Sequence, residues 1–179
     1  MHQLIKKILV SGEEITQRSK ELGQQITKDY EGQEPLFVAL LKGSVPFLAE
    51  LVKYVDLDIE YDFMDVSSYE GTESIGDIKI LKDLDRSIKG IDIILVEDIV
   101  DTGRTLSTVR NMLLNKGANS VKIVTLLDKP SRRVVEISAD YTGFEIENEF
   151  VVGFGLDFDQ KFRNLPYVGV LKDEAYQNK

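Results

Sequence analysis

The chain has 179 residues, of which 42% are hydrophobic and 30% are charged, and its formal net charge is −9. This size and composition predict one globular domain, residues 1–179, with a hydrophobic core. The acidic balance disfavours a nucleic-acid partner, because proteins that bind phosphate backbones are usually basic. The chain has no cysteine and a single histidine, His2. Disulfides and thiolate-held zinc are therefore excluded, and an imidazole base is disfavoured.

No segment approaches the roughly 20 apolar residues that a membrane-spanning helix needs. The first ten residues lack an apolar core of signal-peptide length. We therefore expect a cytoplasmic protein without a membrane partner. Internal repeats and low-complexity linkers are also absent from the sequence.

The first half of the chain predicts a helix, then a strand, then a second helix. Ser11 and Glu14 form a capping-box pattern at the start of a helix that ends before Gly32. The continuous apolar run 36–41 is typical of a strand buried on both faces. A turn at 42–45 then leads into a helix that begins near Pro46.

The rest of the chain continues this alternation. Residues 59–63 alternate between apolar and acidic side chains, which indicates a strand. The polar stretch at about 67–77 predicts a mobile loop, because a loop of this length in a compact domain is more often functional or mobile than passive. A helix is expected between 106 and 117, and further strands at 78–84, 91–96, 121–127, 141–145 and 150–154. This order predicts an α/β fold with a mostly parallel, twisted sheet flanked by helices.

The most informative segment follows the apolar strand at 91–96. It reads Glu-Asp-Ile-Val-Asp-Thr-Gly-Arg-Thr over residues 97–105 and leads into a helix. Ligands of α/β proteins bind where strands end, and free amides and hydroxyls at a helix start suit a phosphate. The neighbouring carboxylates would repel an anion unless a cation or ribose hydroxyls lay between them. The pattern favours a phosphorylated sugar bound with Mg²⁺, although a capped surface loop would have similar spacing.

Residues 97–105 resemble the phosphoribosyl diphosphate motif of the type I phosphoribosyltransferases: two acids, two apolar residues, Asp-Thr-Gly and a hydroxyl residue. The resemblance implies that family's sheet with a small hood segment. It also implies that Glu97 and Asp98 position the ribose hydroxyls and the metal. Asp101 would be the catalytic base toward the purine N7. The 5′-phosphate would bind to the loop made of Asp101, Thr102, Gly103, Arg104 and Thr105.

Leu41, Lys42 and Gly43 follow the buried strand at 36–41. Residues of these types are common in turns that bind nothing, but here they also resemble the diphosphate-binding loop of the 6-oxopurine phosphoribosyltransferases. The resemblance implies that all three bind substrate, and that the Leu41–Lys42 peptide bond is cis. Arg163 corresponds to an arginine on the same diphosphate, where a planar guanidinium suits phosphate oxygens.

Ser68 and Tyr69 lie in the polar stretch at 67–77 and match the family's mobile active-site loop. A surface loop without a function would have the same composition. The resemblance implies that both residues contact the substrate when this loop covers the site.

Three more positions match the family's base-binding segments. Lys129 follows a predicted strand; as a loop lysine it would be solvated, whereas the resemblance implies a hydrogen bond to the exocyclic oxygen of a 6-oxopurine. Phe150 would stack on the base and Val151 would read its edge through main-chain groups, although this run also suits a core strand. Asp157 would be a further Mg²⁺ ligand.

The resemblance extends from 36 to 171 and implies an enzyme of purine salvage in the hypoxanthine-guanine branch. It would transfer the 5-phosphoribosyl group of 5-phosphoribosyl 1-diphosphate to hypoxanthine or guanine, giving IMP or GMP and diphosphate. The implied assembly is a homodimer or a homotetramer. Two alternative functions are disfavoured. A regulator with the same fold would need a basic surface for nucleic acid, whereas this chain is acidic. A Rossmann reductase would need a Gly-x-Gly-x-x-Gly turn, which the sequence lacks.

Overall fold

The computed structural model describes residues 1–68 and 78–175. It contains a six-stranded sheet with the order β4-β3-β2-β5-β6-β7 and a three-stranded sheet with the order β1-β9-β8. The strands are β1 (Ile5–Val10), β2 (Leu36–Leu40), β3 (Glu60–Ser68), β4 (Ile78–Lys82), β5 (Asp92–Val100), β6 (Ser120–Asp128), β7 (Tyr141–Glu145), β8 (Val151–Val152) and β9 (Val168–Leu171).

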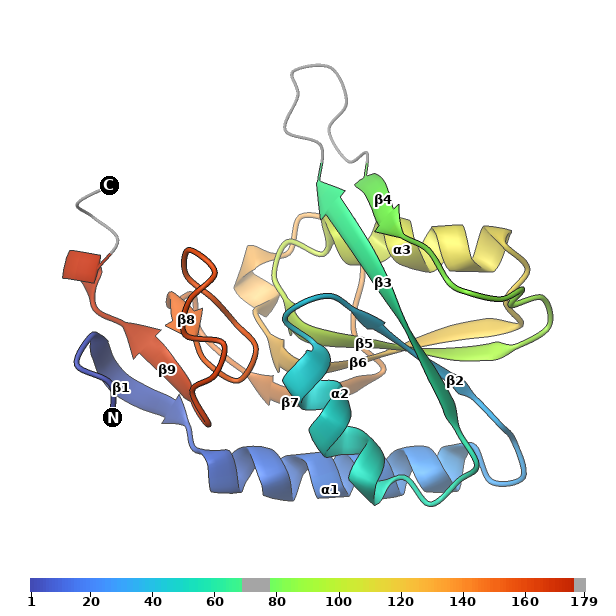
Figure 1. The fold of residues 1–179 in the computed structure, drawn as a ribbon, viewed down its shortest axis with the longest axis horizontal. Coiled ribbons are helices and arrows are strands. Elements are labelled where there is room, and N and C mark those ends of the chain that lie inside the picture. The colour runs from blue at the N-terminus through green and yellow to red at the C-terminus, as the bar shows by residue number, and fades with distance from the viewer. Residues whose placement is uncertain (69–77, 176–179) are drawn as a thin grey trace.

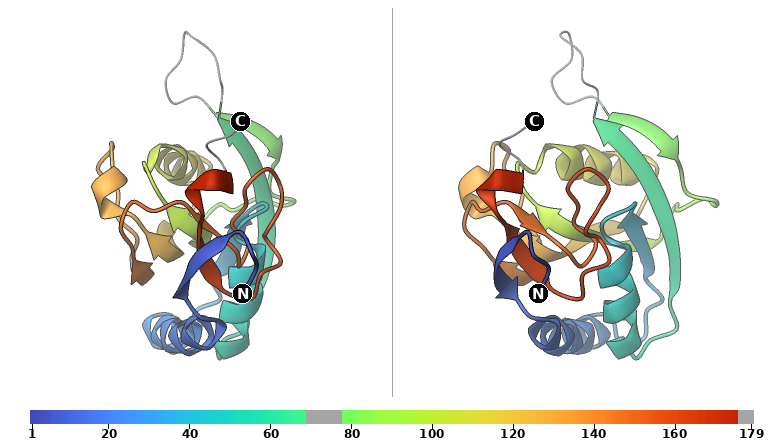
Figure 2. Two further views of the ribbon diagram at one scale, coloured as in Figure 1. Left: turned by 90° about the vertical axis from the view of Figure 1, so that its left-hand side faces the viewer. Right: turned by 60° about the vertical axis from the view of Figure 1, so that its left-hand side comes forward.

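The α-helices are α1 (Gly12–Asp29), α2 (Val45–Leu51) and α3 (Arg104–Asn115), and short 3₁₀ turns span Val52–Tyr54, Pro130–Arg132 and Asp173–Ala175. Every pairing in the larger sheet is parallel except that of β3 with β4. Figures 1 and 2 show α1 and α2 on one face of this sheet and α3 on the other. The predicted fold class is confirmed. Among the described residues, no helix is long and apolar enough to cross a membrane.

The two faces of the large sheet bury different residues of the same strands. Phe37 and Ala39 of β2 belong to the core under α1 and α2, whereas Val38 belongs to the core under α3. Successive side chains of a strand point to opposite faces, so β2 must be apolar at every position. This explains why the continuous apolar run predicted a strand that is buried on both faces.

Helix α1 begins at the predicted capping box. The Ser11 hydroxyl accepts a hydrogen bond from the Glu14 amide at 3.2 Å, and the Glu14 carboxylate accepts one from the Ser11 amide at 2.8 Å. These bonds provide partners for the Ser11 and Glu14 amides, which have no backbone partner at the start of a helix. The capping box therefore fixes the start of α1 directly after β1, where the chain passes from the small sheet to the large one.

The small sheet forms the hood. Its apolar contacts centre on Ile5 of β1, Val152 of β8 and Leu171 of β9. Figure 1 shows the hood beside the carboxyl ends of the parallel strands, which run toward it from the right of the view. Strands β1 and β9 were not predicted, because their pairing joins the two ends of the chain, and β9 otherwise pairs only with β8.

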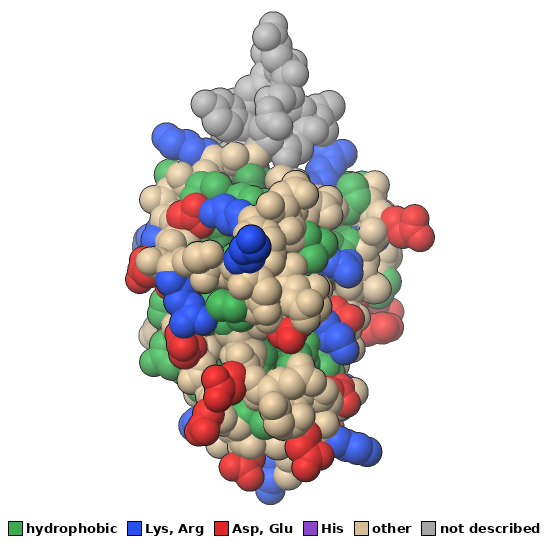
Figure 3. Space-filling model, turned by 90° about the vertical axis from the view of Figure 1, so that its right-hand side faces the viewer, with side chains coloured by type: hydrophobic (Ala, Val, Ile, Leu, Met, Phe, Trp, Pro, Cys, Tyr) green, Lys and Arg blue, Asp and Glu red, His purple; other side chains and the backbone are tan. Residues whose placement is uncertain are grey.

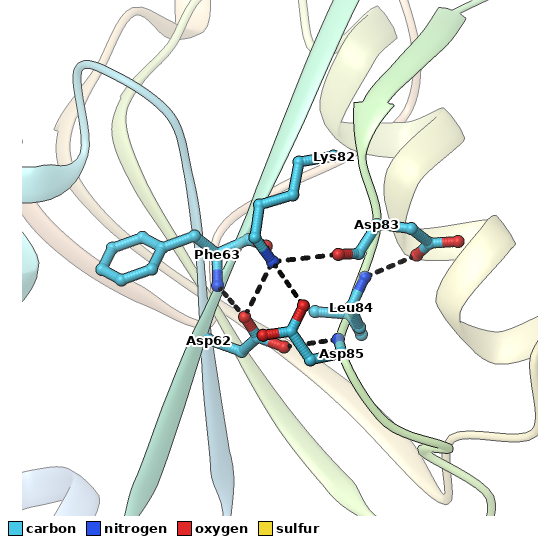
Figure 4. Close-up of polar contacts among 6 residues, drawn as sticks. All are labelled: Asp62, Phe63, Lys82, Asp83, Leu84 and Asp85. Carbon is cyan, nitrogen blue, oxygen red and sulfur yellow. Dashed lines mark hydrogen bonds and ion pairs between the residues drawn. The ribbon is translucent and has the colours of Figure 1, made fainter.

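A lysine-centred network fixes the antiparallel pair β3 and β4 (Figure 4). The Lys82 ammonium donates to Asp62 Oδ1 at 3.1 Å and to Asp85 Oδ1 at 3.2 Å. It also donates to the carbonyl oxygens of Phe63 and Asp83, each at 3.0 Å. These bonds join the two strands that flank the predicted loop at 67–77. Residues 67 and 68 of that loop extend β3, and its remainder lies outside the described residues.

Two further predicted boundaries were wrong. Strand β5 continues through Val100, because its pairing with β6 extends to Val100 and Asp128; the acid pair therefore lies in the strand and not in a loop. The predicted strand at 150–154 contains only the two residues of β8. The chain bends there because Gly153, Phe154 and Gly155 have positive φ angles of 98°, 47° and 99°.

Candidate active site

The loop between β5 and α3 lies at the carboxyl edge of the sheet, as the motif predicted. Gly103 has a φ of +81°, and a Cβ there would lie 2.5 Å from Ile137 Cγ2, so only glycine fits. Helix α3 begins at the next residue, and its first turn has free amides that favour an anion. A cavity of about 120 Å³ adjoins this turn; its lining includes Glu97, Thr102 and Thr105. The site therefore has the donors that a phosphate requires.

A second cavity, of about 440 Å³, adjoins the first. Its apolar lining includes Ile99, Leu156 and the ring of Phe150, which is 41% exposed. Its polar lining includes Lys129 and Asp101. Ile99 and Asp101 line both cavities, so a ligand that fills both must pass these two residues.

Glu97 and Asp98 are neighbours in β5, and both carboxyl groups lie in surroundings that disfavour their charge. Burial raises the pKa of Glu97 well above its usual value, and the Asp98 charge adds to that shift. Burial raises the pKa of Asp98 to about 6, while the Ile99 amide and Arg163 oppose the shift. The Ile99 amide donates to Asp98 Oδ1 at 2.7 Å. Two carboxyl groups that resist ionisation together favour a cation or a set of hydroxyl donors beside them.

The loop after β2 lies directly against Asp98. The Leu41–Lys42 peptide bond is cis, as the resemblance implied. A Cβ at Gly43 would lie 1.7 Å from Asp98 Oδ2, and a Cβ at Gly155 would lie 1.9 Å from the Gly43 carbonyl oxygen. Three segments that are far apart in the sequence therefore meet at this edge of the sheet.

Arg163 and Asp157 belong to the hood side of the site. The Arg163 guanidinium donates to the Gly155 carbonyl at 2.7 Å and forms an ion pair with Asp157 at 2.8 Å. The other Asp157 oxygen accepts a hydrogen bond from the Gln160 amide at 2.8 Å. Both carboxylate oxygens thus have protein partners, so a metal would compete with Arg163 for Asp157.

Lys129 is almost fully buried, with 7% of its surface exposed, so it is not the solvated loop lysine that its position alone would suggest. Its ammonium donates to the Glu149 carbonyl at 2.7 Å. Burial lowers the pKa of Lys129, and the Asp101 charge opposes this shift. An ammonium has three donor positions, so beside its bond to Glu149 the Lys129 side chain retains two for a ligand.

The remaining predicted residues differ in how closely they approach the cavities. Lys42 and Arg104 are exposed, and the Arg104 amide is 3.5 Å from the Thr102 hydroxyl. Val151 is buried and pairs with Val170 of β9. Ser68 ends β3, and Tyr69 lies outside the described residues.

Two arginines of the site carried no sequence signal. Arg132 donates to Asp101 Oδ1 at 3.1 Å and lines the larger cavity. Arg133 donates to the Asp101 carbonyl and forms an ion pair with Asp128. Arginines in a loop are usually solvated, so only the tertiary structure identifies these contacts.

The carboxylates of Glu97, Asp98 and Asp157 are the kind of oxygen ligand that Mg²⁺ prefers. Within residues 1–68 and 78–175, however, no three acids or histidines are grouped closely enough to hold a metal by themselves. This donor set fits an ion that keeps several waters and shares its remaining positions with substrate oxygens.

A third cavity, of about 460 Å³, lies at the opposite edge of the sheet, and its lining includes Asp58, Glu60 and Arg86. The Arg86 guanidinium pairs with the Glu60 carboxylate at 2.9 Å. Figure 3 shows that this side of the molecule carries both acidic and basic side chains. Ligands of α/β sheets bind at the carboxyl edge, so the two cavities at that edge form the candidate active site.

Comparison with known proteins identifies the family. The model of the phosphoribosyl transferase domain matches residues 7–159. The chain belongs to the phosphoribosyltransferase family. Its relatives include hypoxanthine-guanine phosphoribosyltransferases from Lactococcus lactis, 60% identical over 98% of this chain and 96% of the relative, and from Streptococcus thermophilus, 62% identical over 96% of each chain. These matches place it in the hypoxanthine-guanine branch of the family, as predicted.

Solved structures of phosphoribosyltransferases have the same fold. A hypoxanthine phosphoribosyltransferase from Staphylococcus aureus superposes with a TM-score of 0.96 at 50% identity, covering 99% of this chain and 97% of that one. A hypoxanthine-guanine phosphoribosyltransferase from Bacillus anthracis superposes with a TM-score of 0.90 at 43% identity, covering 93% of this chain and 99% of that one. The fold of this phosphoribosyltransferase, hood included, is therefore that of its family.

Proposed function

We propose that this phosphoribosyltransferase transfers the 5-phosphoribosyl group of 5-phosphoribosyl 1-diphosphate to hypoxanthine or guanine, giving IMP or GMP and diphosphate. The observation that carries the proposal is the pair of adjoining cavities that share Asp101. The smaller one has the amides and hydroxyls of a phosphate site, and the larger one has an aromatic ring and a buried ammonium for a base. Its role is in purine salvage, because both products are nucleotides made from free bases.

The loop from Asp101 to Thr105 binds the 5′-phosphate in this proposal. The free amides at the start of α3 and the hydroxyls of Thr102 and Thr105 donate to the phosphate oxygens. Glu97 and Asp98 accept hydrogen bonds from the ribose hydroxyls. Supporting this assignment, Glu97 and the two threonines line the same small cavity.

The diphosphate leaves toward the loop of Leu41, Lys42 and Gly43 and toward Arg163. The bond between C1′ and the diphosphate oxygen breaks, and its electron pair leaves with the diphosphate. Lys42 and Arg163 bring positive charge to the departing oxygens. Bound Mg²⁺ would neutralise part of the diphosphate charge. Glu97, Asp98 and Asp157 are the residues that would hold this ion, directly or through its waters.

Asp101 is the proposed catalytic base. The purine N9 attacks C1′ as the diphosphate departs, and the proton on N7 passes to the Asp101 carboxylate. Attack by N9 makes the N7 proton more acidic, so a carboxylate can accept it. Arg132 lies 3.1 Å from this carboxylate in the free protein, so the entering base replaces that contact.

Lys129 and Phe150 select the base in this scheme. The Lys129 ammonium donates to the exocyclic oxygen at C6, whereas adenine has an amino donor at the same place. A buried donor left without a partner costs roughly 1–3 kcal/mol, more when it is charged. Phe150 stacks on the purine, and main-chain groups of Val151 read its edge. We also propose Ser68 and Tyr69 as substrate-binding residues; Tyr69 lies outside the described residues.

A turnover assay tests the proposed function. The protein is incubated with 5-phosphoribosyl 1-diphosphate, Mg²⁺ and hypoxanthine, guanine or xanthine, and nucleotide formation is followed. We expect IMP and GMP, with adenine as the negative control. Equal turnover of adenine, or no nucleotide from any base, would contradict the proposal.

Gel filtration with light scattering tests the proposed homodimer or homotetramer, and fractionation of cells tests the proposed cytoplasmic location.

A further inference from the structure

All three guanidinium nitrogens of Arg133 donate to acceptors within the protein. Its Nε donates to the Ile137 carbonyl at 3.0 Å, and its Nη1 donates to the Asp101 carbonyl. Its Nη2 forms an ion pair with the Asp128 carboxylate, and only 15% of the Arg133 side chain is exposed. One side chain therefore joins the end of β6 to the loop that follows β5.

The next residue continues this contact. The Val134 amide donates to the Thr102 carbonyl at 3.1 Å. Two successive carbonyls of the phosphate loop, those of Asp101 and Thr102, are thus held by residues 133–134. The methylene groups of the arginine also support the loop, because a Cβ at Gly103 would lie 3.0 Å from Arg133 Cδ.

These contacts fix the direction of two amides. The peptide bonds that follow Asp101 and Thr102 are trans, and in a trans peptide the C=O and N–H point in opposite directions. Because residues 133–134 hold both carbonyls, the Thr102 and Gly103 amides point away from them. Neither amide donates to another of the described residues. Both residues line the cavity of about 120 Å³, and successive free amides form an anion site.

We propose that Arg133 is a positioning residue of the transfer reaction, which aims the Thr102 and Gly103 amides at the 5′-phosphate by holding the Asp101 carbonyl. The inference rests on the proposed function, because that function assigns the phosphate to this loop. Arg133 does not touch the substrate itself. Its ion pair with Asp128 also ties the phosphate loop to the residue next to Lys129, so the two halves of the site are held together.

The test compares Arg133→Met and Arg133→Lys with Arg86→Met. The control removes an arginine that also pairs with a carboxylate, that of Glu60 at 2.9 Å, but at the opposite edge of the sheet. Circular dichroism first shows which variants are folded. Calorimetry then gives the Kd of ribose 5-phosphate, and kinetics give the KM for 5-phosphoribosyl 1-diphosphate and for hypoxanthine.

We expect Arg133→Met to raise the Kd of ribose 5-phosphate and the KM for 5-phosphoribosyl 1-diphosphate by about tenfold or more, since a hydrogen bond from a charged group is lost. The KM for hypoxanthine should change by less than about threefold. Arg133→Lys, which reaches fewer of the three acceptors, should show a smaller change in the same direction. Arg86→Met should behave like the parent. A folded Arg133 variant with unchanged ribose 5-phosphate affinity would overturn the proposal.

A measurement on the parent protein covers the case in which both Arg133 variants fail to fold. Titration with ribose 5-phosphate should shift the amide resonances of Thr102 and Gly103 in nitrogen-15 spectra, and unmoved resonances would overturn the inference. The same titration separates the two proposals. Shifted amides in a protein without purine turnover would contradict only the proposed function, whereas turnover with unmoved amides would contradict only this inference.

Discussion

The carboxylate of Asp98 lies against the α-carbon of Gly43, so closely that a Cβ at residue 43 would lie 1.7 Å from Asp98 Oδ2. The loop after β2 therefore has its shape only because residue 43 has no side chain. The Gly43 carbonyl is in turn packed against Gly155, at 1.9 Å from the position of a Cβ there. Asp98 thus packs against the loop after β2, and Gly155 packs against that loop in turn.

Gly43→Ala should impair catalysis more than it impairs folding. The added methyl group must displace either the Asp98 carboxylate or the loop, and such overpacking costs about 1–3 kcal/mol of stability. We expect kcat/KM to fall by about tenfold or more, because displacement of a positioned group is costly. Gly90→Ala is the control, since an added Cβ at Gly90 has no atom within 4 Å, and the φ of +77° there adds a backbone strain that Gly43 does not have. Equal kcat/KM for the two variants would contradict this account.

Asp98 should destabilise the free protein above pH 6. Its pKa is raised to about 6 from a usual value of 3.8, so the folded state binds this proton more tightly than the unfolded state. The stability from this group is therefore present at low pH and falls as pH rises from about 4 to about 6, by roughly 3 kcal/mol.

Asp98→Asn removes this titration. The variant should have a higher melting temperature than the parent at pH 8, and the difference should shrink toward pH 4. Its turnover should nevertheless fall, because asparagine cannot provide the charge for the metal and the ribose. Thermal unfolding at several pH values measures the difference. A parent that is more stable than Asp98→Asn at pH 8 would show that another group stabilises the charged carboxylate.

Substrate binding should release protons at pH 6. The pKa of Asp98 is raised to about 6, so this group is partly protonated there in the free protein, and the pKa of Glu97 is raised as well. A bound metal–substrate complex favours the charged forms of both groups. Calorimetric titration with 5-phosphoribosyl 1-diphosphate and Mg²⁺, in two buffers that differ in ionisation enthalpy, counts the protons. Asp98→Asn should release fewer protons than the parent; an equal number would exclude Asp98 as their source.

Asp101→Asn should lower kcat and leave the fold intact. Loss of a general base typically costs on the order of 10²–10⁴ in rate. Asparagine still has an oxygen that accepts from Arg132, so the contact at 3.1 Å is retained. Steady-state kinetics with hypoxanthine measure the effect, and an unchanged kcat would remove the assignment of Asp101 as the base.

Lys129→Ala should affect the base and not the sugar phosphate. The variant loses a charged donor in the base cavity, for which we expect kcat/KM with guanine and hypoxanthine to fall by about 10–150-fold. The Kd of 5-phosphoribosyl 1-diphosphate should change by less than about threefold. Lys161→Ala, a change at an exposed lysine, serves as the control. If both substrates were weakened equally, the role of Lys129 in reading the base would be wrong.

The sequence predicted the features that depend on local pattern. The capping box at Ser11 and the buried strand predicted at 36–41 follow from residue spacing, and both are confirmed, the strand as Leu36–Leu40. The hood strands β1 and β9 could not be predicted, because their pairing joins the two ends of the chain. Helix starts and core strands need only neighbours in sequence, whereas the hood depends on contacts made after folding.

The candidate site shows the same division. The residues of 97–105 carry a motif, so their positions at the carboxyl edge were predicted. Arg133 belongs to no motif, and its proposed role depends on the carbonyl of Asp101, which lies more than thirty positions earlier in the chain. The contact between Gly43 and Asp98 is likewise visible only in the folded protein. Sequence patterns thus predicted the groups that we propose to face the ligand, and the structure identified residues that contact these groups.

A crystal structure with bound GMP tests the central claim most directly. The account predicts the 5′-phosphate within the loop from Asp101 to Thr105 and the guanine between Phe150 and Ile99. The exocyclic oxygen of the guanine should lie within hydrogen-bond distance of the Lys129 ammonium. A nucleotide bound elsewhere, with the loop at 101–105 empty, would contradict it.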